Sequence, residues 1–174
     1  MDRHVLQKQF ENGCLVPRQT IFLELHRLAA IFLASERFAE LRGGSDESAH
    51  PIAVLQACEA HEIKRILIFG AAAIRGLDDY LNKVSDLFVY ACGDITFGDE
   101  STGELSVRDA CDKILHASRI QPGVATHENG NIYFDGNIVL SAVDPKKKKH
   151  TWESRINVID FIRESTHYLE QFEV

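Results

Sequence analysis

Apolar residues in the N-terminal half of the chain recur mainly at helical spacing. Over residues 17–41 they fall three and four positions apart along one stripe, which is typical of an amphipathic helix. A second helix is predicted from Pro51 to about Ala60. A third is predicted over residues 63–84, where the steps of four and three continue without a break. The first half of the chain therefore predicts helices joined by short loops.

The C-terminal half mixes helical and strand signals. Gly93–Gly103 is rich in turn residues and is predicted to be a loop, followed by a helix over about Leu105–Ser118. Two β-prone runs flank Asp135-Gly136, which is typical of a two-residue hairpin, and a turn at residues 128–130 would add residues 124–126 as a third strand. A final amphipathic helix is predicted over about Trp152–Phe172, capped by Thr151.

The segment around Ile66–Phe69 also allows a different interpretation. It could be a buried strand that leads into a phosphate-binding loop, as in a nucleotide-binding α/β domain. Only Gly70 and Gly76 lie nearby, so neither the dinucleotide-binding nor the P-loop glycine pattern is present. The unbroken helical period favours the helix, and the nucleotide-binding alternative requires a strand here.

Together these elements predict a mainly α fold, a helical bundle with a small antiparallel β-hairpin inserted before the C-terminal helix. The length of 174 residues suits a single domain over residues 1–174. A composition of 45% hydrophobic and 26% charged residues is ordinary for a globular protein and excludes a disordered tail or a coiled-coil rod.

Charge and cysteine pattern exclude several functional classes. A net charge of −7 argues against a large nucleic-acid-coating surface, because such domains are usually basic. No apolar run approaches the roughly 20 residues of a membrane span, and no apolar signal region follows Met1–His4, so we expect a cytoplasmic protein without membrane contact. The cysteines form no CxxC pair, and we expect Cys58 and Cys111 to be reduced core residues. Neither a metal nor another cofactor is predicted.

Candidate chemistry concentrates in the helix predicted over residues 105–118. At about 100° per residue, Arg108, Asp112, His116 and Arg119 lie along one stripe, opposite an apolar side that should face the core. The arginines could bind a phosphate by bidentate hydrogen bonds, and the histidine could transfer a proton near neutral pH. The same pattern also suits a solvated helix face with ion pairs one turn apart.

The phrase LSVRDACDKILHA, between long helices and a hairpin followed by a final helix, resembles the HEPN superfamily. These are helical-bundle domains of bacterial toxins, abortive-infection proteins and RNA-processing enzymes. Their arginine, polar follower and histidine fall here on Arg108, Asp109 and His116. The resemblance implies a metal-independent endoribonuclease of a bacterial defence or toxin system, or a degenerate relative, and a homodimer whose two motifs face one RNA cleft. In that reaction His116 would transfer the proton of the ribose 2′-OH, and Arg108 would stabilise charge on the phosphorane.

Two further features bear on function. Arg163 and His167 offer a second arginine–histidine pair, slightly closer in sequence than the family motif, whereas Arg108 and His116 are slightly further apart. The run Lys146–Lys149 could contact an RNA backbone or form a soluble loop.

The alternative to a ribonuclease is a non-catalytic helical-bundle binding or immunity-type protein that acts through protein–protein contacts. Arg108 and His116 would then lie on a wet surface in ion pairs rather than in a cleft. The partners that these hypotheses predict are RNA, a second copy of the chain, and an antitoxin or other protein.

Overall fold

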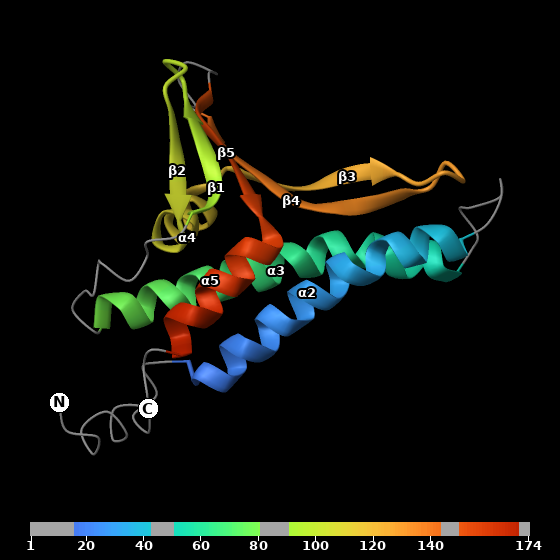
Figure 1. The fold of residues 1–174 in the computed structure, drawn as a ribbon, viewed down its shortest axis with the longest axis horizontal. Coiled ribbons are helices and arrows are strands. Elements are labelled where there is room, and N and C mark those ends of the chain that lie inside the picture. The colour runs from blue at the N-terminus through green and yellow to red at the C-terminus, as the bar shows by residue number, and fades with distance from the viewer. Residues whose placement is uncertain (1–15, 43–50, 81–90, 144–149, 171–174) are drawn as a thin grey trace.

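The described part of the chain has a mixed α/β fold in which four helices pack on one face of an antiparallel sheet (Figure 1). The computed structural model describes residues 16–42, 51–80, 91–143 and 150–170. Helices α2 (Arg18–Leu41) and α3 (Pro51–Tyr80) run antiparallel along the longest dimension of the molecule, and α5 (Val158–Glu170) lies across the first half of α2. The short helix α4 (Val107–His116) packs mainly on α3.

The sheet has five strands in the order β2-β1-β5-β4-β3, and every neighbouring pair is antiparallel. The strands are β1 (Ala91–Phe97), β2 (Thr102–Ser106), β3 (Arg119–Thr126), β4 (Ile132–Val143) and β5 (His150–Asn157). Side chains that point to the helices are buried in one continuous core, among them Ile95, Leu140 and Ile156. On the opposite face the alternate residues, such as Thr96 and Glu153, are exposed.

The prediction of a mainly α helical bundle is wrong, and the glycine-rich segment before α4 is one reason. Residues 91–97 and 102–106 form β1 and β2, where a loop was predicted. Each strand of this hairpin carries few apolar residues, because only its inward-facing positions, such as Ile95 and Leu105, are buried. This short alternation of buried and exposed positions is difficult to recognise among the glycines and acidic residues. β1 is held in the sheet by its pairing with β5.

The N-terminal helices agree with the apolar period. α2 covers the helix predicted over residues 17–41, and α3 joins the two helices predicted after Pro51 into one of 30 residues. Residues 65–69 lie inside α3, so the strand required by a nucleotide-binding domain is not formed. Residues 81–84 of the predicted helix and the run Lys146–Lys149 lie outside the described residues.

The predicted hairpin turn at Asp135-Gly136 is instead a bulge inside β4. Pro122 pairs with Ile138 and Val124 with Phe134, so residues 135–137 face a single residue of β3. Gly136 has a φ of +88°, and the Asp135 side chain accepts the backbone N–H of Asn137 at 2.9 Å. An Asp-Gly pair suits a bulge as well as a turn. Because β4 pairs with β3 on both sides of this pair, the chain forms a bulge here. The second predicted turn, at residues 128–130, is confirmed as the connection from β3 to β4.

The last helix begins later than its apolar spacing predicts. Residues 152–157 belong to β5, and α5 starts at Val158. The side chain of Asn157, and not that of Thr151, caps the helix by accepting the backbone N–H of Asp160 at 3.0 Å. Ser154 occupies an inward position of β5, which disguises the strand alternation between Trp152 and Ile156.

The β3–β4 hairpin is fastened to the C-terminal end of α2. The amides of Asn129 and Asn131 both donate to the carbonyl of Ala39, at 2.9 and 2.8 Å. Three residues further along β4, the backbone N–H of Phe134 donates to the buried Ser35 hydroxyl at 2.9 Å. The two asparagine bonds satisfy the carbonyl of Ala39, which lies in the last helical turn and has no partner within the helix.

Asn131→Ala is therefore expected to lower the free energy of unfolding by about 1 kcal/mol, because Asn131 is 1% exposed and the Ala39 carbonyl would keep only the exposed Asn129 donor. Urea unfolding measures this change. Asn129→Ala is the matched control, since Asn129 is exposed and makes the same type of bond. An equal loss in both variants would contradict the role assigned to the buried amide.

Candidate functional site

Helix α4 carries the main predicted site. Its start is defined by hydrogen bonds in the first turn. Ser106 caps the helix, since its hydroxyl accepts the backbone N–H of Asp109 at 3.2 Å and donates to the Asp109 carboxylate at 2.7 Å. The apolar side of the helix faces the core as predicted, with Val107, Cys111 and Ile114 buried. Leu115, expected on that side, is 39% exposed. The carboxylate of Asp109 is therefore engaged in capping the helix N-terminus.

Arg108 faces a buried carboxylate of α3. Its guanidinium forms an ion pair with Asp78, which is only 1% exposed. The same carboxylate accepts the hydroxyl of Tyr168 from α5 at 3.2 Å and an N–H of Arg75 at 3.2 Å. Asp78 therefore joins α3, α4 and α5 through one buried charge.

Arg75 extends this cluster to the predicted supporting residue Asp112. Its Nε atom lies 2.7 Å from the Asp112 carboxylate, and its Nη1 atom lies 3.1 Å from that of the exposed Asp79. Asp79 is also 3.6 Å from Arg108. Two guanidiniums thus stand among three carboxylates, so the positive charge needed to attract a phosphate is already neutralised within the cluster. We refer to Arg75, Asp78, Asp79, Arg108 and Asp112 as the ion-pair cluster.

His116 and Arg119 lie outside the ion-pair cluster. His116 is the exposed last residue of α4, and Arg119 is the exposed first residue of β3. The predicted continuation of the helical stripe to Arg119 is wrong, because the helix ends before it. The eight-residue step from Arg108 to His116 corresponds to about 12 Å along the axis and about 80° around it.

The second predicted pair lies on the outer side of α5. Arg163 pairs with Asp160 at 3.0 Å and with Glu164 at 2.8 Å, within the same helix. His167 Nδ1 lies 3.8 Å from Glu164. The side chains of Arg163 and His167 are 55% and 58% exposed. Arg163 and His167 therefore lie on an exposed face of α5 and form ion pairs within that helix.

Sequence reasoning missed Arg75, Asp78 and Tyr168. Asp78 and Asp79 are adjacent acidic residues on one helix, and only Asp79 is exposed. The available signal was the spacing from Arg75 to Asp78, because residues three apart on a helix are neighbours. Burial is the main cause that raises the pKa of Tyr168 to about 12, so its hydroxyl remains a donor to Asp78.

Trp152 and Lys113 form a second polar contact of α4. The Lys113 ammonium lies 4.7 Å from the centre of the Trp152 ring and 5.7 Å from that of Phe97. The sequence analysis predicted Trp152 at the start of the last helix, whereas it lies on β5. This cation–π contact fixes α4 against β1 and β5.

The described cysteines do not supply a reactive thiolate in the core. Burial raises the pKa of Cys92 to about 12 and also raises that of Cys111, so both thiols are protonated at neutral pH. Cys58 is exposed on α3, contrary to the predicted core position. Among residues 16–42, 51–80, 91–143 and 150–170, no group of three or more His, Cys, Asp or Glu side chains is arranged to hold a metal ion.

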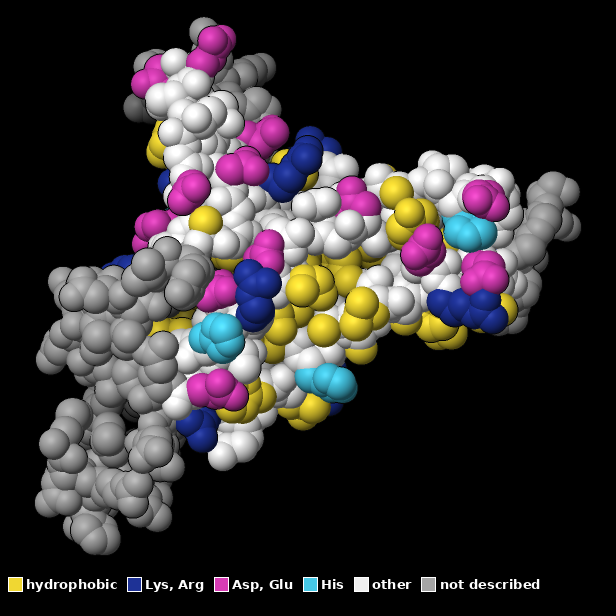
Figure 2. Space-filling view, viewed as in Figure 1, with side chains coloured by type: hydrophobic (Ala, Val, Ile, Leu, Met, Phe, Trp, Pro, Cys, Tyr) yellow, Lys and Arg dark blue, Asp and Glu magenta, His cyan; other side chains and the backbone are white. Residues whose placement is uncertain are grey.

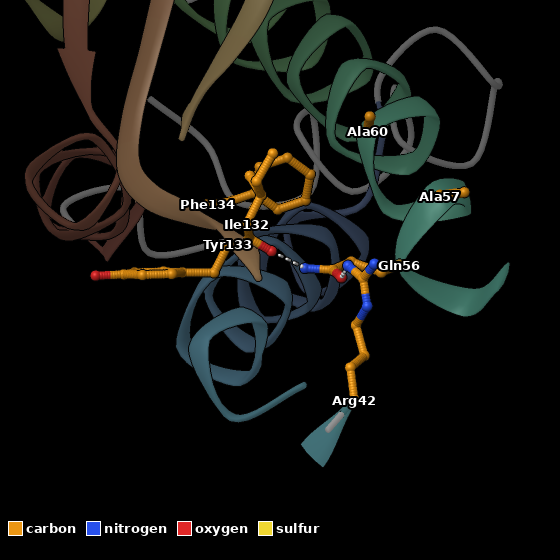
Figure 3. Close-up of a pocket in the computed structure, with 7 residues that line it drawn as sticks. All are labelled: Arg42, Gln56, Ala57, Ala60, Ile132, Tyr133 and Phe134. Carbon is orange, nitrogen blue, oxygen red and sulfur yellow. Dashed lines mark hydrogen bonds between the residues drawn. The ribbon is translucent and has the colours of Figure 1, made fainter. Parts of the chain in front are cut away.

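A cavity of about 360 Å³ between α3 and β4 is separate from all predicted site residues (Figure 3). Its walls include Ala57, Ala60 and Phe134. Gln56 lies at its polar side, accepting an N–H of Arg42 at 2.6 Å and donating to the backbone carbonyl of Ile132 at 2.8 Å. The Gln56 amide is therefore used to join α3 to β4.

Comparison with protein-family models, curated proteins and solved structures finds no significant match to this chain. Within the part of the chain that the structure describes, none of the helices combines the length and apolarity that a membrane crossing requires.

Proposed function

We propose that this protein is a non-catalytic binding domain that acts through protein–protein contacts. The observation that carries the proposal is the pairing of Arg108 with the buried Asp78. A guanidinium that stabilises phosphorane charge must be free to turn toward a phosphate. Arg108 is held toward the interior by a carboxylate, so it serves the packing of α4 on α3.

Withdrawing Arg108 from Asp78 would be unfavourable. A buried charge that loses one of its partners is strongly destabilising, and a bound phosphate would also approach Asp79 and Asp112. His116 is on a different side of the helix end, about 12 Å along the axis. This separation supports two independent side chains rather than an acid–base site on one phosphate.

The excess of acidic over basic residues also supports protein contacts over RNA contacts. The chain carries 26 acidic and 19 basic residues, and a backbone-binding surface must supply positive charge to replace counterions. A second copy of the chain or an antitoxin remains a predicted partner of such a domain.

Incubation of the purified protein with total RNA and a chelator tests the proposal. We expect no cleavage by the wild-type protein, by His116→Ala or by His167→Ala, because Arg108 and Arg163, the arginines predicted to act with these histidines, are held in ion pairs. Gel analysis of the RNA measures this, with a known ribonuclease added to a parallel sample as the positive control. Cleavage that co-purifies with the wild-type protein and disappears in either folded histidine variant would overturn the proposal in favour of the endoribonuclease.

A further inference from the structure

Strand β2 forms an open edge of the sheet. In the strand order β2-β1-β5-β4-β3 it pairs only with β1 among the described residues. The β1–β2 hairpin stands away from the long helices α2 and α3 (Figure 1). Thr102 and Glu104 are exposed, so the outer side of the strand is accessible.

The hydrogen-bond pattern shows which backbone groups point outward. The N–H of Phe97 donates to the carbonyl of Ser101 at 2.9 Å, so residues 97 and 101 form a hydrogen-bonded pair. Such pairs alternate along an antiparallel ladder. Thr102 and Glu104 are therefore in non-hydrogen-bonded pairs, and their N–H and C=O groups face the open edge rather than β1. An added strand would find two donors and two acceptors there.

The hairpin that carries this edge is strongly acidic. Residues 91–106 contain four acidic side chains and no lysine, arginine or histidine. Acidic side chains gather over β1 and β2 in the space-filling view (Figure 2). Asp94 and Glu104 are direct cross-strand partners on the exposed face, and like charges in that arrangement repel. Arg155 on β5 faces Asp94 from the other side and leaves Glu104 beside the open edge.

We infer that the edge of β2 binds a basic, extended segment of a protein partner by strand addition. Backbone hydrogen bonds to Thr102 and Glu104 would supply affinity, as in other sheet-edge complexes. A lysine or arginine opposite Glu104 would lie on the same exposed face and relieve the repulsion between Glu104 and Asp94. The partner is therefore a strand with basic side chains at alternate positions. This inference names the partner of the proposed binding function and rests on it.

The structure also indicates which side chains of the added strand would fit on its core-facing side. Gly103 has no side chain, and a Cβ placed there would meet only Ile95, at 3.6 Å. A small apolar side chain of the partner opposite Gly103 can therefore pack beside Ile95 and Leu105, both of which belong to the core. The expected segment alternates basic and apolar residues, with period two.

Titration with a capped octapeptide of alternating lysine and valine tests the inference. We expect binding that weakens with added salt and that perturbs the amide resonances of Thr102 and Glu104. A peptide of alternating glutamate and valine is the charge control and should not bind. Absence of lysine-peptide binding, or equal binding of both peptides, would overturn the inference.

Two pairs of variants distinguish the contribution of backbone hydrogen bonds at the β2 edge from that of the acidic side chain. Thr102→Pro removes an outward N–H without removing a bond to β1, and it should weaken peptide binding about tenfold, whereas Thr102→Val keeps the amide and should bind normally. Glu104→Lys should also weaken binding about tenfold, whereas Glu128→Lys makes the same charge change on an exposed residue of the other hairpin and should not.

Thermal melting confirms that each variant is folded before it is compared. Equal binding by Thr102→Pro and Thr102→Val would overturn strand addition, and equal binding by Glu104→Lys and Glu128→Lys would overturn the charge contact. If Thr102→Pro does not fold, slowed hydrogen exchange of the Thr102 and Glu104 amides in the wild-type complex decides the same point. RNA cleavage overturns the proposed function whatever the peptide does, whereas absence of both cleavage and peptide binding overturns only this inference.

Discussion

Arg108→Ala is expected to lower the free energy of unfolding by about 3 kcal/mol, because it removes a partner from a buried carboxylate. Asp78 would keep its contacts with Arg75 and Tyr168, both at 3.2 Å. It would lose the guanidinium that joins it to α4. Equilibrium urea unfolding followed by circular dichroism measures the loss.

His116→Ala provides the control for this prediction. His116 is exposed at the end of the same helix, so its replacement should change stability by less than about 0.5 kcal/mol. In a double-mutant cycle, Asp78→Asn should cost less in the Arg108→Ala background than in the wild type, since the two side chains interact directly. Unchanged stability of Arg108→Ala would show that the arginine is not structural and would restore it as a candidate site residue.

Glu59→Gln is expected to raise the free energy of unfolding by about 2–3 kcal/mol at pH 8. Glu59 on α3 is 9% exposed, and its Oε2 atom has no hydrogen-bond partner within the described structure. Burial raises the pKa of this carboxyl from 4.5 to about 7. The folded protein therefore holds the proton more tightly than the unfolded chain does.

The sign of this effect sets its pH dependence. The stabilising contribution of protonated Glu59 is complete below pH 4.5 and is lost as pH rises to about 7, where the folded-state carboxyl ionises. Glutamine resembles the protonated acid and does not titrate. The difference between Glu59→Gln and the wild type should be close to zero at the acidic end of this range and should reach its full value above pH 7.

Glu62→Gln is the matched control for Glu59→Gln, one helical turn away on α3. A hydrogen bond from Arg65 lowers the pKa of Glu62, which is the opposite direction. Its replacement should therefore bring no gain in stability at pH 8. Thermal melts from pH 4 to 8 compare both variants with the wild type. A pH-independent difference for Glu59→Gln would contradict the buried ionisable carboxyl.

The parts of the fold that depend on local periodicity could be predicted from the amino-acid sequence. The apolar stripe of α2 and most of α3 were recognisable because each helix repeats its buried positions over many turns. The core-facing side of α4 and the turn at residues 128–130 were also recognisable from a few neighbouring residues. These signals need no knowledge of the partner element.

The sheet was decided only by tertiary pairing. β1 and β2 are short and glycine-rich, and β1 joins the rest of the sheet only by pairing with β5, which is distant in sequence. The Asp135-Gly136 pair is compatible with both a turn and a bulge, and the pairing of β4 with β3 selects the bulge. In β5, the inward Ser154 hides the period of two, so the helix was extended back to Trp152.

The candidate site shows the same division. Sequence spacing placed Arg108, Asp112 and His116 on one helix, which the structure retains. It could not reveal that Asp78 is buried against Arg108, because that contact joins positions 30 residues apart on different helices. Local periodicity determines which side of a helix is polar. Whether that side meets solvent, a ligand or a buried carboxylate is decided by the element that packs beside it.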